Sequence, residues 1–495
     1  MWNFITNTKH KSYIYSLAGT SILLGILFDY LFFEKFFGIS VFIFEAVLII
    51  ITLWFCLRLQ YVVRPTFWLL ACALFFTAMV GVRANLFLTL LNILASGGLL
   101  LLATQEFLKK RIINFKIPDY VITIIVTPFK ILRHFLRTVL FLGTPIEKTS
   151  TNVMKRVIIG IIMALPFLIL FGFLFTSADL AFKQLVDSIF RFHISDEWIG
   201  HAILIIGVSV ISLGLFAYLF NIPPEIHSSE NLEKIKPEKE VTDRKIEVKV
   251  FLWLIAGLFA IFLIFQIAYL FGGIINISQG NFTYAEYARK GFWELLTVAF
   301  FTLLILLVMD TQTKSSISRF SWFTLPSLVL TVEIFIIIIS AFKRLMLYQE
   351  AYGLTSLRLY VAGFIVFLGV VFILLAVKLW RGKNESFFAF GTLLSMIIFL
   401  VSFNLLNPDG FIAKKNIDRF NQGGGIDAHY LGSLSVDAVP TILNAYDRFS
   451  NEDKAILQQL ILIKKDDLKQ QKSDWQSYNV SRDRALREID NKILK

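Results

Sequence analysis

The segment LYVAGFIVFLGVVFILLAVKLW, residues 359–380, contains a single charged side chain, Lys378, close to its end. A helix needs about 20 mostly apolar residues to cross a bilayer, so this segment predicts a membrane span. Similar segments recur along the chain and predict about 11 spans in all. The predicted spans are residues 14–33, 37–57, 66–83, 86–104, 156–176, 200–220, 250–271, 292–309, 324–344, 358–380 and 387–405. The expected fold class is all-α: a polytopic α-helical membrane bundle with a small helical C-terminal domain.

The composition supports a membrane protein. Of the 495 residues, 56% are hydrophobic and 17% are charged, whereas about a quarter of the residues of a soluble protein are charged. The net charge of +12 comes mostly from basic residues between the apolar segments, where they predict orientation and contact with phospholipid rather than with nucleic acid. Cys56 and Cys72 lie inside apolar segments, so we expect neither a disulfide nor a zinc site.

The distribution of Lys and Arg predicts the orientation, because cytoplasmic loops carry the excess. With a cytoplasmic N-terminus, 25 of these residues fall in inside segments, 9 in outside loops and 14 in the C-terminal tail. Long tails are translocated largely regardless of charge, so the tail does not decide the orientation. We therefore expect the N-terminus inside and the tail outside.

Residues 117–142 are long enough to span, and a twelfth span here would reverse the orientation of everything that follows. Two prolines interrupt this segment, and Lys130, Arg133 and Arg137 recur at the spacing of one helical face. Such a face is typical of a helix that lies in the membrane interface against anionic head groups. We favour this interfacial interpretation, with the three cations as lipid head-group contacts.

The chain is predicted to divide into four parts: a four-span region at 1–105, a basic interfacial segment at 106–155, a seven-span core at 156–406 with a cytoplasmic linker at 221–249, and a soluble helical tail at 407–495. In the tail, Asn407 before a proline is expected to cap one helix. Ser450 and Ser481 are expected to cap later ones.

The stretch FTYAEYARKGFWELL, residues 282–296, combines aromatic and charged side chains at the start of a predicted span. Its T-x-x-E pattern predicts a capped helix beginning near Tyr284, and Glu286 and Arg289 fit an interfacial collar of paired charges and aromatic residues. Glu294 is harder to explain as a collar residue, because an unpaired carboxylate in an apolar run is costly and usually serves a function. The structural and functional interpretations are evenly balanced here.

Two other acidic residues lie within predicted spans. Glu333, in the middle of LVLTVEIFIIIIS, is expected to face the bundle interior near a base and is the best single candidate for a proton- or ion-linked role. Asp29 lies near the outer end of the first span, where it could pair with Lys35 or reach the interface.

The connection between the ninth and tenth spans repeats the composition of residues 282–296. It contains Glu350 and Arg358 among tyrosines, and Gly353 is expected to break the helix between them. Asp179 closes the fifth predicted span, where Ser177 or Asp179 could cap the following helix.

Five segments, SAD at 177–179, FTYAEYARKGFWEL, YGLTSLRLY, NPDGFIAKKNIDRF and DAHYLGSLSVDAVP, together resemble the bacterial membrane proteins grouped as domain of unknown function 4173, which is related to the 4153 group. No resembling segment is found before residue 150. The resemblance implies an integral inner-membrane protein of bacteria with a C-terminal extension. It implies no substrate, cofactor or catalytic residue.

Under the predicted orientation all five segments fall at or beyond the outer ends of spans. We therefore expect one polar cluster on the outer face, beneath the helices that begin at Asn407. Its candidate members are Asp179, Tyr284, Glu286, Arg289, Glu294, Glu350 and Arg358.

The leading expectation is a non-catalytic role in transport, envelope assembly or signalling, in which residues 407–495 engage an envelope protein. One alternative is a membrane enzyme acting on a lipid-linked substrate, with Glu286 as general base and Arg289 or Arg358 as phosphate ligand. Another is a scaffold or sensor that works through the tail. We expect no cofactor or metal, because the phosphate-binding, nucleophile and HExxH motifs are missing from the sequence.

Overall fold

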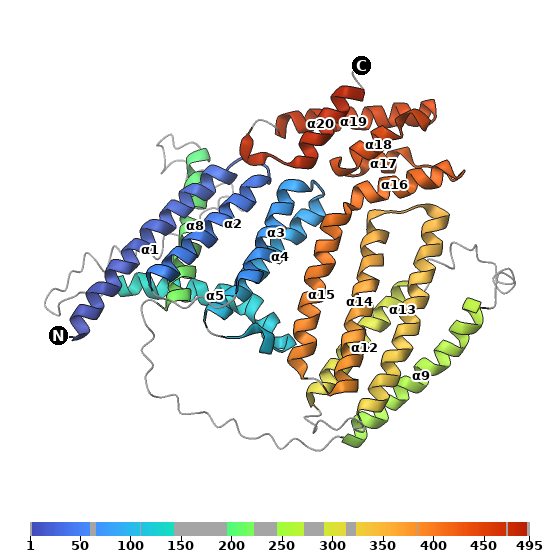
Figure 1. The fold of residues 1–495 in the computed structure, drawn as a ribbon, viewed down its shortest axis with the longest axis horizontal. Helices are drawn as coiled ribbons and strands as arrows, with labels where there is room; N and C mark the ends of the chain where they lie inside the picture. Colours follow the sequence, from blue (N-terminus) through green and yellow to red (C-terminus); the bar gives the residue numbers. More distant parts are fainter. Residues whose placement is uncertain are drawn as a thin grey trace, which may run out of the picture.

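The computed structural model describes residues 2–59, 66–108, 110–142, 196–221, 245–271, 292–312, 323–382, 384–471 and 474–492. Within these ranges every regular element is a helix (Figure 1). Long apolar stretches favour this outcome, because a helix satisfies all of its backbone hydrogen bonds within one segment. The predicted all-α class is confirmed for this part of the chain.

One group of spans comes from the first half of the chain. It comprises α1 (Trp2–Phe32), α2 (Ile39–Arg58), α3 (Phe67–Val82), α4 (Leu86–Phe107) and α8 (Asp196–Phe220). α1 packs along α8, and α3 packs between α2 and α4. Leu17, Phe55 and Phe216 are among the buried side chains that join α1, α2 and α8.

The second group comprises α9 (Lys245–Phe271), α12 (Phe292–Gln312), α13 (Thr324–Tyr352), α14 (Ser356–Arg381) and α15 (Glu385–Leu406). α13 packs against α9, α12 and α14, and α14 packs against α15. Leu252, Leu306, Ile334 and Phe372 belong to the buried core of this group.

Seven of the described helices are long and apolar enough to cross a membrane: Tyr13–Phe32, Ile39–Arg58, Leu86–Phe107, Gly200–Phe220, Thr324–Tyr352, Ser356–Arg381 and Glu385–Leu406. Three predicted spans correspond to shorter apolar helices, at Phe67–Val82, Val248–Ile264 and Leu295–Met309. The predicted span at 156–176 lies outside the described residues. The structure thus supports a multi-span helical protein and leaves the predicted number of about 11 spans unconfirmed.

α5 (Ile117–Leu142) is the helix that lies across the others in Figure 1, and it packs against α8 and α4. It begins beside the first turn of α15, where Lys116 Nζ lies 2.7 Å from Glu385 Oε2. By length and composition α5 is not among the seven helices suited to span a membrane, and the interfacial interpretation stays a prediction.

The tail, residues 407–492 of the described chain, is built from short helices. The α-helices of the tail are α16 (Pro408–Asn421), α17 (Ala428–Ser433), α18 (Val439–Asn444), α19 (Asn451–Gln471) and α20 (Val480–Lys492). The tail also contains the 3-10 turns η2 (Val436–Ala438), η3 (Tyr446–Arg448) and η4 (Trp475–Ser477). Another 3-10 turn, η1 (Ile112–Asn114), precedes α5.

The helix caps of the tail follow two of the three predictions. Asn407 accepts a hydrogen bond from Gly410 N at the start of α16, and Ser450 Oγ accepts one from Asp453 N at the start of α19. The predicted cap at Ser481 is wrong. Asn479 Oδ1 accepts from Arg482 N instead, because α20 begins two residues earlier than the sequence pattern indicated.

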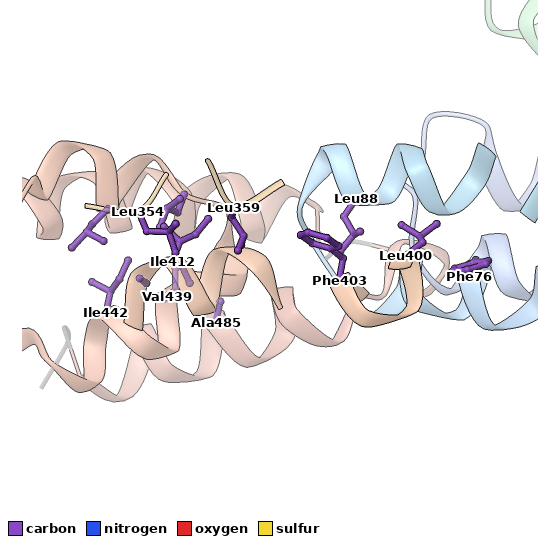
Figure 2. Close-up of a cluster of buried hydrophobic side chains, with 14 of the residues drawn as sticks. Phe76, Leu88, Leu354, Leu359, Leu400, Phe403, Ile412, Val439, Ile442 and Ala485 are labelled. Atoms are coloured by element: carbon purple, nitrogen blue, oxygen red, sulfur yellow. The ribbon is translucent and has the colours of Figure 1, made fainter. Parts of the chain in front are cut away.

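The tail lies across one end of the spans, which we call the tail end of the bundle, whereas the N-terminus of α1 lies toward the opposite end (Figure 1). One hydrophobic core continues from the spans into the tail. Figure 2 shows Phe76, Leu88 and Phe403 at its bundle side and Ile412 and Val439 at its tail side. The tail is therefore packed onto the bundle and does not stand apart from it.

Candidate functional site

Buried polar groups gather where the tail meets the tail end of the bundle, a region we call the tail junction. Local helix chemistry sets its backbone. Asn85 ends the α3–α4 turn and caps α4, with its Oδ1 accepting from Leu88 N at 2.9 Å. Asn407, at φ 55°, ends α15 and caps α16 at the same time. The chain therefore turns directly from the last span into the tail.

Asp437 is the centre of the junction. This tail residue is only 5% exposed, and its Oδ2 accepts hydrogen bonds from the backbone amides of Ala84 at 2.9 Å and Asn85 at 3.0 Å. Ser435 Oγ donates to the same oxygen at 3.3 Å. A carboxylate from the tail thus satisfies two backbone donors of the α3–α4 turn.

The charge state of Asp437 follows from these surroundings. Burial raises the pKa of Asp437, and the Ser481 hydroxyl, the Ala84 amide and the Arg83 guanidinium offset part of that effect. The neighbouring Asp409 carboxyl raises the pKa of Asp437 further. Asp437 is consequently a carboxyl group for which the neutral form is unusually accessible.

Asp409, the second buried carboxyl, lies in the first turn of α16 and is 2% exposed. Its Oδ2 accepts from Asn85 Nδ2 at 2.9 Å and from Ser435 N at 3.1 Å. Its Oδ1 is buried and accepts no hydrogen bond from the described residues. Asn85 thus connects both aspartates of the tail to the start of α4.

A second set of contacts joins α16 to the turn between α13 and α14. Gly353, at φ 79°, ends α13 as predicted. The next residue, Leu354, exchanges two hydrogen bonds with the Asn416 side chain, both at 2.8 Å. Arg419 donates to the carbonyl oxygens of Glu350 and Ala351 at 3.0 and 2.7 Å.

The predicted site residues of this turn have structural partners. The Arg358 guanidinium donates to Gly353 O and stacks over Tyr348, 4.1 Å from the ring centroid. Ser356 N donates to Tyr430 Oη at 2.8 Å. The YGLTSLRLY, NPDGFIAKKNIDRF and DAHYLGSLSVDAVP segments thus meet at the tail junction.

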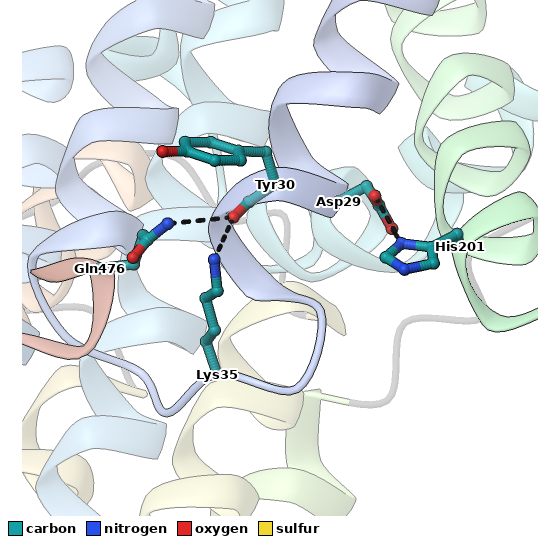
Figure 3. Close-up of polar contacts among 5 residues, drawn as sticks. All are labelled: Asp29, Tyr30, Lys35, His201 and Gln476. Atoms are coloured by element: carbon teal, nitrogen blue, oxygen red, sulfur yellow. Dashed lines mark hydrogen bonds and ion pairs between the residues drawn. The ribbon is translucent and has the colours of Figure 1, made fainter. Parts of the chain in front are cut away.

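The end of α1 forms a third contact region, drawn in Figure 3. Tyr30 O accepts from Lys35 Nζ at 2.9 Å and from Gln476 Nε2 of the tail at 3.4 Å. Asp29 pairs with His201 of α8 at 2.7 Å. The suggested Asp29–Lys35 pair is therefore wrong, because α8 brings an imidazole to Asp29 while Lys35 bonds to the backbone of α1.

The remaining predicted residues are distributed as follows. Asp179, Tyr284, Glu286 and Arg289 lie outside the described residues, as does the side chain of Glu294 in α12. Glu333 is buried in α13 as expected, but the expected neighbouring base is not found among the described residues, and its Oε2 accepts no hydrogen bond there. Lys130, Arg133 and Arg137 lie on α5.

Asp409 and Asp437 lie in segments that carry the family resemblance, but neither residue is among those predicted from the sequence to form a site. Each residue has a local sequence pattern that could have drawn attention to it. Asp409 directly follows Asn407-Pro408 in a first helical turn, and Asp437 lies two residues after Ser435, whose Oγ accepts from Asp437 N at 3.3 Å. Both patterns predict local caps, so neither indicates a partner more than 300 residues away.

Chemically, the junction is equipped to fix backbone positions. Among the described residues no group of three or more His, Cys, Asp or Glu side chains could hold a metal ion. The two aspartates instead accept amide and hydroxyl hydrogens, which positions the tail relative to the α3–α4 turn.

Lys464 gives the junction a testable pH dependence. Burial lowers the pKa of Lys464 to about 8, partly offset by Asp409, and its Nζ donates to Leu434 O. Between about 8 and the ordinary value of 10.5, the unfolded chain holds a proton that the folded chain has lost, so stability rises with pH across that window. As the pH rises through this window, the free energy of unfolding of the wild type should increase by about 1 to 3 kcal/mol relative to that of Lys464→Met. Thermal unfolding at a series of pH values measures this difference. Lys469→Met, on an exposed site of α19, should keep the wild-type slope.

Comparison with known proteins adds a family match. The family model described as "Domain of unknown function (DUF4153)" matches residues 69–445, from the start of α3 to the end of α18. The match begins well before residue 150, although no resemblance was found there in the sequence, and it includes both junction aspartates. No curated protein and no solved structure matches the chain.

Proposed function

The chain belongs to the DUF4153 family, and on that premise we propose that it is an integral inner-membrane protein of bacteria that passes conformational changes between its spans and an envelope protein bound to its tail. A relation to the 4173 group and a total of about 11 spans belong to the same proposal. Its role is then signalling, or a transport activity that is coupled to the envelope protein.

The observation that carries this proposal is the pair of buried tail carboxyls, Asp409 and Asp437, bonded to the α3–α4 turn. Removing one partner of such a buried network leaves unpaired polar groups, which is costly. The tail and the first group of spans should therefore move as one body. A mechanical link of this kind suits a protein that transmits a change across a membrane.

The orientation with the N-terminus inside and the tail outside is supported by two features. The N-terminus and the tail lie toward opposite ends of the bundle. α5, near the end away from the tail, exposes Ile122, Ile125 and Phe129 next to the cations Lys130 and Arg133. An apolar stripe bordered by cations suits the head-group region of an anionic leaflet, as the cytoplasmic leaflet is.

Site-specific photo-crosslinking in living cells tests the proposed partner. A photoreactive amino acid replaces Trp475, which is exposed on the tail, and a control replaces Trp198, which is exposed on α8. We expect a discrete adduct with one envelope protein from position 475 and none from position 198.

The junction is then varied in the same cells to test the coupling. Asp437→Ala should abolish or greatly weaken the adduct from position 475, whereas Asp447→Ala, at an exposed tail residue, should leave it unchanged. An adduct that persists undiminished in Asp437→Ala would indicate a scaffold whose tail acts independently of the spans. The lack of an adduct from position 475 and from neighbouring Tyr478 would contradict the partner itself.

A further inference from the structure

A row of polar side chains leads from the tail junction into the membrane along one face of α4. Asn85, Thr89, Asn92 and Ser96 are spaced by four, three and four residues, which places them on the same side of the helix. The three that follow the cap are 9%, 0% and 2% exposed. With a rise of about 1.5 Å per residue, Ser96 lies about 16 Å along α4 from Asn85.

Three of the four residues in this row have a polar partner on another element, whereas Thr89 lies between them. Asn85 bonds to Asp409 at the junction, 2.9 Å away. Asn92 and Asn404 of α15 exchange two side-chain hydrogen bonds, at 2.8 and 2.7 Å. Ser96 Oγ donates to Glu45 Oε2 of α2 at 2.6 Å, and the row ends on this carboxyl group.

Glu45 is poorly compensated for a carboxylate. It is 5% exposed, and its Oε1 is buried without a hydrogen bond from the described residues. Between their ends, α2, α3, α4 and α15 contain no Lys, Arg or Asp. Besides Glu45, the titratable groups on the described side chains of α1 to α4 are those of Tyr13, Tyr15, Asp29, Tyr30, Cys56, Arg58, Cys72 and Glu106. Asp29 is paired with His201, and η4 contributes none.

Such an environment favours the neutral acid, because an ionised carboxylate without a cation is expensive inside a membrane. If Glu45 served only to pack α2 against α4, a single hydrogen bond to Ser96 would be enough. A serine or threonine at position 45 could make such a bond. The buried polar row gives this acid a connection to the polar groups under the tail.

We propose that Glu45 is a proton-binding site within the bundle, which exchanges its proton with water at the tail end along the row Asn85, Thr89, Asn92–Asn404 and Ser96. The ligand is the proton itself, delivered by water. The proposal goes beyond the proposed function, since it requires no partner and no movement of the tail.

Infrared spectroscopy tests the site directly. The full-length protein in lipid nanodiscs is transferred from H2O to D2O, and the C=O stretch of protonated carboxyl groups is followed with time. The difference from Glu45→Gln, which keeps an acceptor for Ser96, assigns the Glu45 band. We expect a protonated Glu45 band in the wild type that shifts on deuteration. Absence of that band at neutral pH would overturn the proposal.

Variants that interrupt the row test the route. Asn92→Leu/Asn404→Leu replaces the amide pair by apolar side chains of similar size, and Thr89→Val replaces a hydroxyl by a methyl group. Each should slow exchange at Glu45 by about tenfold or more, while the carboxyl bands that remain in Glu45→Gln keep their wild-type rates. Unchanged exchange at Glu45 in both variants would show that Glu45 only packs α2 against α4. If the double variant fails to fold, Thr89→Val alone decides the question.

Discussion

Replacing Asp437 by alanine is expected to weaken the attachment of the tail to the bundle. The substitution removes the acceptor of two partly buried backbone amides, those of Ala84 and Asn85. An unsatisfied buried donor costs about 1 to 3 kcal/mol, and two partly buried donors should together cost the junction about 1 to 4 kcal/mol. The loss is read as a lower thermal midpoint of the purified protein and as faster proteolysis of residues 407–492.

Two matched variants separate the hydrogen bonds from the negative charge. Asp437→Asn keeps an oxygen that can accept from the amides. Because burial raises the pKa of Asp437, a neutral side chain is tolerated there, and this variant should retain most of the stability. Asp447→Ala removes an exposed carboxyl group of the same tail and should have no measurable effect. Equal behaviour of Asp437→Ala and Asp447→Ala would show that the aspartate network does not hold the tail.

The elements themselves could be predicted from local sequence. Long apolar stretches specify spans, and residues with special backbone preferences specify their ends, as Gly353 does for α13 and Asn407 for α15 and α16. Both signals depend only on residues within one or two helical turns. The cations and prolines of α5 likewise predict an interfacial helix rather than a twelfth span.

The partners of these elements could not be predicted in the same way. An apolar face indicates that one side of a tail helix is buried, but it does not specify which surface covers that side. Ile412 and Val439 therefore fit a separate soluble domain as well as they fit the shared core seen in Figure 2. The Asp29–His201 pair joins residues 172 positions apart, a distance at which spacing carries no information.

The polar residues of α4 show the same limit. Asn85 and Asn92 can be seen near the start of a predicted span, but the row becomes recognisable only when α15 contributes Asn404 and α2 contributes Glu45. Glu333 was predicted to be functional because it lies in the middle of a predicted span. Glu45 lies in an equally apolar segment but was not predicted to be functional. The difference between them is that a row of polar side chains on α4 lies between Glu45 and the junction.

Gly353→Ala is the second substitution for which we expect a large loss. Gly353 has φ 79° and ψ 174°, a backbone region that is essentially restricted to glycine and costs other residues about 1 to 3 kcal/mol. A Cβ atom would also lie 2.6 Å from Asn416 Oδ1. Moving that amide would break its two hydrogen bonds to Leu354. The combined loss should be about 2 to 5 kcal/mol, measured as the shift of the thermal midpoint.

Gly423 provides the matched control, because it also has a positive φ, 88°, but no atom lies within 4 Å of the Cβ that an alanine would add. Gly423→Ala should therefore show the cost of a positive φ without a contact, and we expect a larger loss in Gly353→Ala because of the contact with Asn416. A double-mutant cycle with Asn416→Ala isolates the same term, since Gly353→Ala should cost less once the amide is gone. Equal losses for Gly353→Ala and Gly423→Ala, together with additivity in the cycle, would mean that the Leu354–Asn416 pair does not hold the α13–α14 turn to the tail. A positive coupling would instead show that the Leu354–Asn416 pair holds the tail independently of Asp437. This second contact lies on the α13–α14 turn, which belongs to the other group of spans.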